Sequence, residues 1–276
     1  MIETQTIRLE GDYTGVASTN PGRIRSRNED SYIVRPDLGL FGVADGMGGH
    51  RKGDVASGIC VDSIQRWFDG KVEGAVKKKL LNSESVADDT LKAPEQELIN
   101  SVIFANREIF SLGSSSPAHE GMGTTLVIAM FQGRSVFVVW SGDSRLYRLR
   151  KGRLRPVTKD HSLLNEYLKM QMISKSQERD FPMRNIITKA LGLQKRADIE
   201  SMRVRYEHGD VFLFCSDGLN DMLEDKEISD ILCGPGSLNQ RAERLIEAAN
   251  SAGGADNITV VLVQRSCLHP DPCSCP

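Results

Sequence analysis

The stretch TTLVIAMFQGRSVFVVW, residues 124–140, carries the strongest structural signal in this chain. Residues 124–131 and 135–140 are short runs rich in Val, Ile and Phe, a composition typical of β-strands. Between them lies Gln132-Gly133-Arg134, a glycine-containing turn short enough to join antiparallel neighbours. We therefore predict a β-hairpin of two apolar strands near the middle of the chain.

Eight further runs of the same kind predict strands on either side of this hairpin. They lie at residues 13–19, 31–35, 38–44, 145–150, 153–158, 199–206, 210–215 and 257–264. Ser141-Gly142-Asp143 and Lys151-Gly152 separate successive runs, and we interpret both as hairpin turns. Together these turns predict an antiparallel meander.

Helical periodicity is confined to two pairs of segments. The first pair is 53–68 and 95–112, joined by a polar stretch around 70–94, and the second is 226–232 and 238–252. Strands, two helices, strands, two helices and a last strand predict an α+β protein with packed sheets and helices outside them. No linker-like segment interrupts the order, so we expect one domain.

Composition excludes several classes of protein. The 276 residues include 26% charged and 6% aromatic residues with a net charge of −2, which argues against a disordered chain and a basic or stacking nucleic-acid binder. The longest apolar stretch, 126–131, is too short to cross a membrane, and the N-terminus lacks the apolar core of a signal peptide. Three of the six cysteines, Cys60, Cys215 and Cys233, lie within apolar segments, and we interpret them as reduced core thiols. We expect a cytoplasmic protein with no nucleic-acid or membrane partner.

Five aspartates stand beside predicted strands, most of them next to glycine. Asp-Gly also favours any ordinary turn, so a single example would carry little weight. Strongly apolar strands lead to three of the five, and strand ends bring such carboxylates to one edge of a sheet. Clustered carboxylates repel unless cations lie between them, and oxygen-only ligands favour Mg²⁺ or Mn²⁺. The five are Asp30, Asp45, Asp143, Asp217 and Asp256.

Eight segments in a fixed order carry a family resemblance. They are RSRNED, VADGMGGH, GMGTTLV, SGDSRLY, DHSL, RNIITKALG, CSDGLND and GGADNITVVLV. They resemble the signature blocks of the metal-dependent protein phosphatases, the protein phosphatase 2C type, in its bacterial form. The resemblance extends from about residue 13 to 264 and implies a β-sandwich of two stacked antiparallel sheets flanked by helix pairs (αββα).

The resemblance also implies roles for individual residues. Asp45 matches the aspartate that bridges two metal ions, and the carbonyl of Gly46 matches a ligand of the second ion. Asp217 and Asp256 match the remaining ligands of the first ion. Asp143 matches an acid that, with Asp217, holds a third, weaker ion. Arg25 matches the arginine that grips the substrate phosphate, and Asp30, with its neighbour Glu29, matches the acidic pair that orients metal-bound water.

Two positions modify this assignment. Met47 occupies the place where many eukaryotic relatives carry a histidine proposed as the general acid, so the general acid is unassigned and metal-bound water is the default. No phosphoenzyme is implied, so Cys60 and Cys215 are expected to be core residues rather than nucleophiles. His50 and His161 are interpreted as structural.

The resemblance divides the chain into three parts. Residues 1–12 are expected to form an N-terminal extension and residues 13–265 the phosphatase domain, with a substrate-selecting flap at about 161–193. The tail, 266–276, holds Cys267, Cys273 and Cys275 and is expected to be disordered rather than a metal site.

The expected function is hydrolysis of phosphoserine and phosphothreonine in phosphoproteins at a binuclear Mn²⁺ or Mg²⁺ site, by a monomer that opposes a bacterial Ser/Thr kinase. Two alternatives stay open: a phosphatase dedicated to one regulatory partner of the anti-sigma-antagonist type, and a catalytically dead phosphoprotein-binding regulator. A metal-dependent nuclease shares the carboxylates but needs a basic groove that the net charge does not favour.

Overall fold

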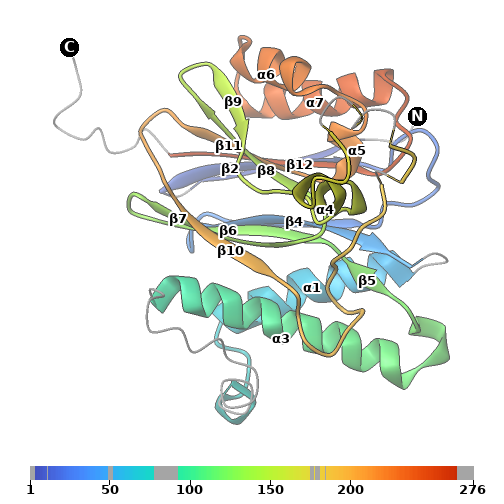
Figure 1. The fold of residues 1–276 in the computed structure, drawn as a ribbon. Coiled ribbons are helices and arrows are strands. Elements are labelled where there is room, and N and C mark those ends of the chain that lie inside the picture. The colour runs from blue at the N-terminus through green and yellow to red at the C-terminus, as the bar shows by residue number, and fades with distance from the viewer. Residues whose placement is uncertain are drawn as a thin grey trace.

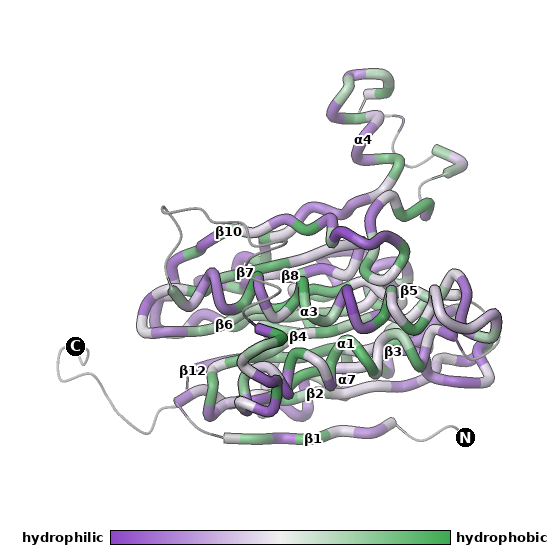
Figure 2. The backbone as a smooth tube through the Cα atoms, turned by 90° about the horizontal axis from the view of Figure 1, so that it is seen from below, coloured by the Kyte–Doolittle hydropathy of each residue, from purple (hydrophilic) through white to green (hydrophobic). Residues whose placement is uncertain are grey.

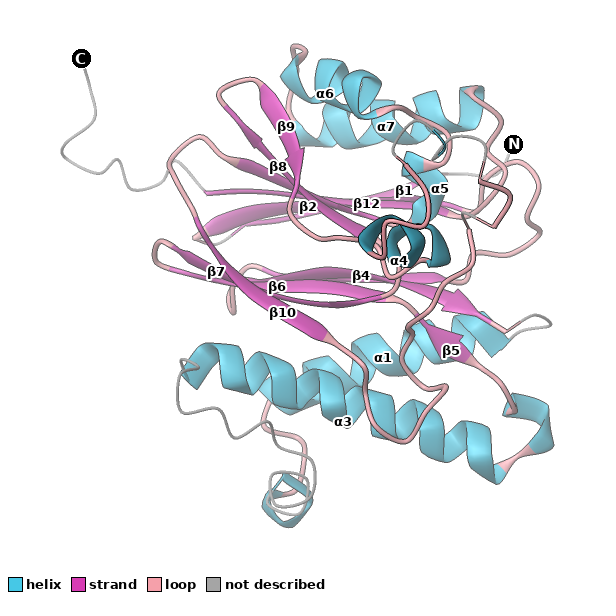
Figure 3. Cartoon of the chain, viewed as in Figure 1, coloured by secondary structure: helices cyan, strands magenta, loops and turns pink. Residues whose placement is uncertain are grey.

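Two antiparallel β-sheets stack face to face, with helices on both outer faces (Figure 1 and Figure 3). The computed structural model describes residues 4–10, 12–48, 52–77, 93–174, 177, 181–183 and 185–265. Sheet 1 has the strand order β1 (Gln5–Glu10), β2 (Tyr13–Asn20), β12 (Ile258–Arg265), β11 (Val211–Cys215), β8 (Arg145–Arg150) and β9 (Arg153–Pro156). Sheet 2 has the order β10 (Glu200–Arg205), β7 (Ser135–Ser141), β6 (Leu126–Gln132), β4 (Leu40–Met47) and β3 (Asp30–Arg35), with β5 (Gly123–Thr124) beside β4.

A pair of helices covers each sheet. Helices α1 (Lys52–Phe68) and α3 (Ala93–Ser115) pack on sheet 2. Helices α6 (Asp225–Cys233) and α7 (Leu238–Ser251) pack on sheet 1 beside the single turn α5 (Asp217–Asn220). Helix α4 (Leu163–Lys169) projects from the layered body, as Figure 2 shows. The predicted αββα architecture is confirmed.

The apolar run in β6 is continuous because the strand contributes to two cores at once. Leu126, Ile128 and Met130 pack with α1 and α3. Val127 and Phe131 pack between the sheets. Side chains alternate between the faces of a strand, so a strand buried on both faces has to be apolar throughout. A third core joins sheet 1 to α6 and α7.

The prediction of a hairpin at Ser141-Gly142-Asp143 is wrong. Strand β7 pairs with β6 and β10, whereas β8 pairs with β9 and β11 in the other sheet. The connection therefore crosses from one sheet to the other, with Gly142 at a φ of +107°. Turn residues mark a reversal of the chain, but they do not distinguish edge-to-edge pairing from face-to-face stacking. The predicted hairpins at Gln132-Gly133-Arg134 and Lys151-Gly152 are confirmed.

The strand β1 lies in what we expected to be an extension. It pairs with β2 along its whole length, from Gln5 opposite Thr19 to Glu10 opposite Thr14. Ile7 packs against the core between the sheets, and this contact anchors an otherwise polar segment. None of the described helices is both long and apolar enough to cross a membrane.

Candidate metal centre

The carboxylates converge because antiparallel strands bring opposite chain ends together. Asp45 lies near the end of β4 and Asp30 begins β3, and the two residues are direct backbone partners across the ladder. Asp217 follows β11 as the first residue of α5, and Asp256 precedes β12, which pairs with β11. One end of the sandwich therefore receives acids from both sheets.

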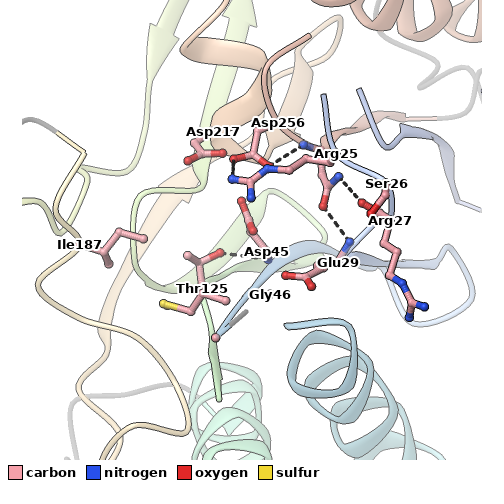
Figure 4. Close-up of a pocket in the computed structure, with 13 residues that line it drawn as sticks. Arg25, Ser26, Arg27, Glu29, Asp45, Gly46, Thr125, Ile187, Asp217 and Asp256 are labelled. Carbon is pink, nitrogen blue, oxygen red and sulfur yellow. Dashed lines mark hydrogen bonds and ion pairs between the residues drawn. The ribbon is translucent and has the colours of Figure 1, made fainter. Parts of the chain in front are cut away.

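A cavity of about 620 Å³ opens at this end (Figure 4). Two predicted residues do not line it. Asp30 is the ladder partner of Asp45 and accepts a 2.7 Å hydrogen bond from Ser216 Oγ. Asp143 lies in the connection between β7 and β8. The lining residues are Arg25, Ser26, Arg27, Glu29, Asp45, Gly46, Met47, Gly48, Thr125, Ile187, Asp217, Asp256 and Asn257.

The acids at this end raise one another's pKa. Burial and then the charges of Asp30 and Asp217 raise the pKa of Asp45 well above its usual range. Burial, followed by the charge of Asp143, does the same for the pKa of Asp217. Burial raises the pKa of Asp30 to about 6, and burial with Asp160 nearby raises the pKa of Asp143 to about 7. A cation among these carboxylates would favour their ionised forms and lower the pKa of each.

Three buried carboxylate oxygens have no hydrogen-bond partner among the described residues. They are Oδ1 of Asp30, Oδ1 of Asp143 and Oδ1 of Asp217. An unsatisfied buried acceptor costs about 1–3 kcal/mol, and more when it is charged. Carboxylate oxygens are the ligands that Mg²⁺ and Mn²⁺ prefer, so these residues fit divalent cations.

In the described part of the chain, no three acidic, histidine or cysteine side chains have the spacing of a metal-binding group. Magnesium usually keeps several waters and takes only one or two carboxylates, so a centre of this kind does not need three protein ligands for each ion.

Gly46 lets the backbone at the end of β4 approach two other backbone segments closely. A Cβ atom at this position would overlap Gly53 O and lie 2.6 Å from Glu29 O, which no side chain tolerates. The Gly46 amide donates a 3.2 Å hydrogen bond to Glu29 O. The glycine after Asp45 thus holds the end of β4 against the first turn of α1.

Arg25 lies at the mouth of the cavity, in the loop between β2 and β3. Its Nη2 donates a 2.7 Å hydrogen bond to Asp256 Oδ2, and the side chain is 58% exposed. This hydrogen bond and the charge of Asp256 raise the pKa of the guanidinium. The pair occupies one nitrogen of a side chain with five N–H donors, so Arg25 has donors left for an anion.

Several polar residues that the sequence analysis did not single out position the acids. The Asn257 side chain accepts from Glu29 N at 2.8 Å and donates to Arg27 O at 2.7 Å, so it ties the Arg25 loop to the Asp256 turn. Thr125 Oγ1 accepts from the Asp45 amide at 3.1 Å. Asn257 and Ser216 are next to the predicted ligands Asp256 and Asp217 in the sequence. That adjacency is the sequence signal that could have identified them as positioning residues.

The cysteines and histidines discussed in the sequence analysis do not line the cavity among the described residues. Cys60 and Cys215 are buried, and burial raises the pKa of each thiol to about 12, which agrees with their interpretation as core residues. The prediction of a third core thiol is wrong, because Cys233 is exposed at the end of α6. His161 is buried and accepts from the Gly142 amide through Nδ1 at 3.1 Å, as a structural histidine does. Burial and Lys189 lower its pKa. His50 and the tail lie outside the described residues.

Among the described residues of the predicted flap, one side chain reaches the cavity. Ile187 lines the cavity, and Leu191 bridges to Thr124 beside β4. Asn185 Nδ2 donates to Asp221 Oδ2 at 3.4 Å, close to α5. Stacked sheets that end in an acidic cavity lined with oxygen ligands are typical of a metal-dependent hydrolase.

Comparison with known proteins identifies the family. The family described as Protein phosphatase 2C matches residues 25–262. The serine/threonine phosphatase stp of Listeria welshimeri is 39% identical over 255 residues, covering 91% of this chain and 95% of that protein. The crystal structure of the Mycobacterium tuberculosis serine/threonine phosphatase PstP/Ppp is similar with a TM-score of 0.78 and 32% identity, covering 91% of this chain and 98% of that one. The PstP catalytic domain in complex with two manganese ions has a TM-score of 0.75 and 31% identity, covering 91% and 97%. This chain belongs to the protein phosphatase 2C family.

Proposed function

We propose that this chain hydrolyses phosphoserine and phosphothreonine in phosphoproteins with the help of Mn²⁺ or Mg²⁺ at the acidic end of the sandwich. The observation that carries the proposal is the convergence of five aspartates there, three of them with a buried oxygen that has no hydrogen-bond partner among the described residues. Family membership and the serine/threonine phosphatases among its relatives support it.

The roles of the acids follow from their positions. Asp45, Asp217, Asp256 and the carbonyl of Gly46 border the cavity and would hold two ions. Asp143, whose charge acts on Asp217, would share a third ion with it. When bound, such a pair of ions supplies Lewis acidity to the phosphoryl group and makes a water acidic enough to ionise near neutral pH.

Arg25 would bind the substrate phosphoryl group, and Asp30 would position the attacking water. The guanidinium of Arg25 at the cavity mouth can donate two parallel hydrogen bonds to phosphoryl oxygens, a geometry that lysine cannot reproduce. Oδ2 of Asp30 is held by Ser216, which leaves Oδ1 free to accept from a water beside Asp45. Asp30 would thereby orient the attacking water and hold its proton.

The leaving group needs a proton from another source. Met47 lines the cavity and has no proton to give, and the other titratable side chains that line it, among the residues the structure describes, are acids and arginines. We propose that water in the cavity protonates the departing seryl or threonyl oxygen. The chain would act as a cytoplasmic monomer on proteins phosphorylated by a Ser/Thr kinase, and its flap at about 161–193 would select among them.

Phosphate release from a phosphothreonine peptide tests the proposal. It is measured with Mn²⁺, with Mg²⁺ and with EDTA, for the wild type, for Asp217→Asn and for Asp230→Asn. Asp230 lies exposed on α6 and provides a matched change of charge away from the cavity. We expect metal-dependent turnover in the wild type and the control, and loss of turnover in EDTA and in Asp217→Asn. A wild type that binds Mn²⁺ but releases no phosphate would favour the phosphoprotein-binding regulator.

A further inference from the structure

The hairpin of β8 and β9 carries a concentrated positive surface. Another cavity, of about 460 Å³, lies here, and every described residue that lines it is cationic. We call it the arginine face, and it consists of Arg148, Arg150, Lys151, Arg153 and Arg155. Five cations at one site contrast with the net charge of −2 of the whole chain.

Most of this charge is not neutralised. Arg150 pairs with Asp210 at 2.7 Å and with Glu207 at 2.6 Å. Arg148 makes one hydrogen bond of 3.4 Å, to the backbone carbonyl of Arg205. Lys151, Arg153 and Arg155 are exposed and form no ion pair with any described residue. Within the described part of the chain, four of the five positive charges therefore have no acidic partner.

The strand pairing makes this arrangement unfavourable for stability. In the β8–β9 ladder Arg148 lies directly opposite Arg155, and Arg150 lies directly opposite Arg153. Directly opposed residues project on the same face of the sheet, and like charges in such pairs are destabilising. The repulsion falls on Arg148 and Arg155, because Arg150 is paired with two acids. Charged residues on an edge strand also prevent aggregation, which is another possible reason for the arginines. Alternating Glu and Arg would give the same protection and would stabilise the hairpin as well. The repeated arginine therefore points to a binding role.

We infer that the arginine face docks an acidic segment of a phosphoprotein substrate, several residues away from the phosphorylated side chain. This inference rests on the proposed function and adds a substrate feature to it. Arginine forks bind carboxylate and phosphate oxygens with two donors each, so a run of Asp, Glu or phosphorylated residues is the complementary surface.

The length of strand β8 sets the expected spacing between the phosphorylated residue and the acidic segment. Strand β8 begins at Arg145, two residues after Asp143, and ends at Arg150 in the hairpin tip, far from α5 in Figure 1. Five residues of strand span about 17 Å. An extended peptide covers that distance in roughly five or six residues. We therefore expect the acidic segment to begin about five or six residues from the phosphorylated residue.

Other polyanions fit this surface less well. A nucleic acid needs an extended basic track, whereas Glu207 and Asp210 border the arginine face. Binding at a membrane surface combines basic with apolar side chains, and none of the described large hydrophobic residues that are exposed lies on this hairpin. A short acidic protein segment is the ligand whose size and charge match.

A pair of phosphothreonine peptides tests the inference on the full-length chain. One peptide carries four glutamates six residues from the phosphothreonine, on either side in separate versions, and the other carries glutamines there. The wild type is compared with Arg153→Gln/Arg155→Gln. The matched control is Lys195→Gln/Arg196→Gln, which removes the same charge from an exposed loop outside the arginine face.

We expect the wild type to prefer one glutamate peptide through a lower KM, and the preference to fall as salt is added. Two weak surface pairs correspond to roughly a fivefold change in kcat/KM. The arginine variant should lose the preference while it hydrolyses the glutamine peptide normally, and the control should keep the preference. Equal turnover of both peptides by the wild type, or a preference that survives in the arginine variant, would overturn the docking inference.

Two further outcomes separate the inferences. Failure to hydrolyse even the glutamine peptide with metal would instead overturn the proposed function. Binding of duplex DNA or of phosphatidylserine vesicles that depends on Arg153 and Arg155, without binding of the unphosphorylated glutamate peptide, would also overturn the docking inference.

Discussion

Replacing Asp30 with asparagine should stabilise the metal-free protein at neutral pH. The folded state raises the pKa of Asp30 from 3.8 to about 6, chiefly through burial. Although the residue keeps some exposure, its Oδ1 is buried without a partner among the described residues. A carboxyl whose pKa is raised on folding contributes stability below its unfolded pKa and loses it as the pH rises through the folded value. An asparagine at this position would have no such loss, and its side-chain oxygen can still accept from Ser216.

The magnitude follows from the size of the shift. One pKa unit corresponds to 1.36 kcal/mol, so a shift of about 2 units gives about 3 kcal/mol at pH 7.5 and about 1 kcal/mol at pH 4.5. For a chain of this length, 3 kcal/mol raises the melting temperature by roughly 6–12 °C. The neighbouring acids titrate together with Asp30, so the measured curve belongs to the cluster.

The assay is urea and thermal unfolding in EDTA at both pH values, for the wild type, Asp30→Asn and the exposed control Asp230→Asn. We expect the Asp30→Asn gain to be larger at pH 7.5 than at pH 4.5 and the control to show no such dependence. Saturating Mn²⁺ should reduce the gain, because the wild type has more charge for the ions to neutralise. A gain that is equal at both pH values, or a less stable variant at pH 7.5, would refute the electrostatic reasoning.

Three other substitutions test separate parts of the structure. Gly46→Ala should destabilise the protein by about 1–3 kcal/mol in urea unfolding, because its Cβ would meet two backbone carbonyls. The control Gly74→Ala has open space around it and should not destabilise the protein. Equal effects of the two substitutions would contradict the steric argument. Asp143→Ala should lower kcat while calorimetry still detects the other two Mn²⁺ ions, and unchanged turnover would remove the third-ion assignment. Arg155→Thr should raise the melting temperature by relieving its repulsion with Arg148, by up to about 1 kcal/mol in stability; a lower melting temperature would show that the opposed arginines do not repel.

The strands and the main helices were predictable because their signals are local. In β6 the apolar run encodes burial on both faces within seven residues, and the helical periodicity of 53–68 and 238–252 corresponds to α1 and α7 with shifts of one residue. Asp45, Asp217 and Asp256 were predictable for a similar reason, since each lies next to an apolar strand and a glycine or a turn. The family resemblance added their roles, which the local pattern does not contain.

Two short elements were missed because their local sequence signal is absent or weak. The single turn α5 has four residues, fewer than one full repeat of a helical pattern can show. Strand β1 alternates polar residues with Ile7 and Leu9, which is a strand pattern, but it has only two apolar residues and Leu9 is 44% exposed. Its pairing with β2 is what establishes the strand.

Long-range packing determined the remaining features. The turn at Ser141-Gly142-Asp143 reads as a hairpin, yet β10, some sixty residues later in the chain, takes the edge of β7 and β8 joins the other sheet. That crossing places Asp143 between the two sheets, where its charge acts on Asp45 and Asp217. The pair of Arg25 and Asp256 spans 231 positions of sequence, and the opposed arginines of β8 and β9 depend on strand register. Periodicity along the chain reports which faces are buried, but it carries no information about which distant strand covers them, and only the folded structure supplies that.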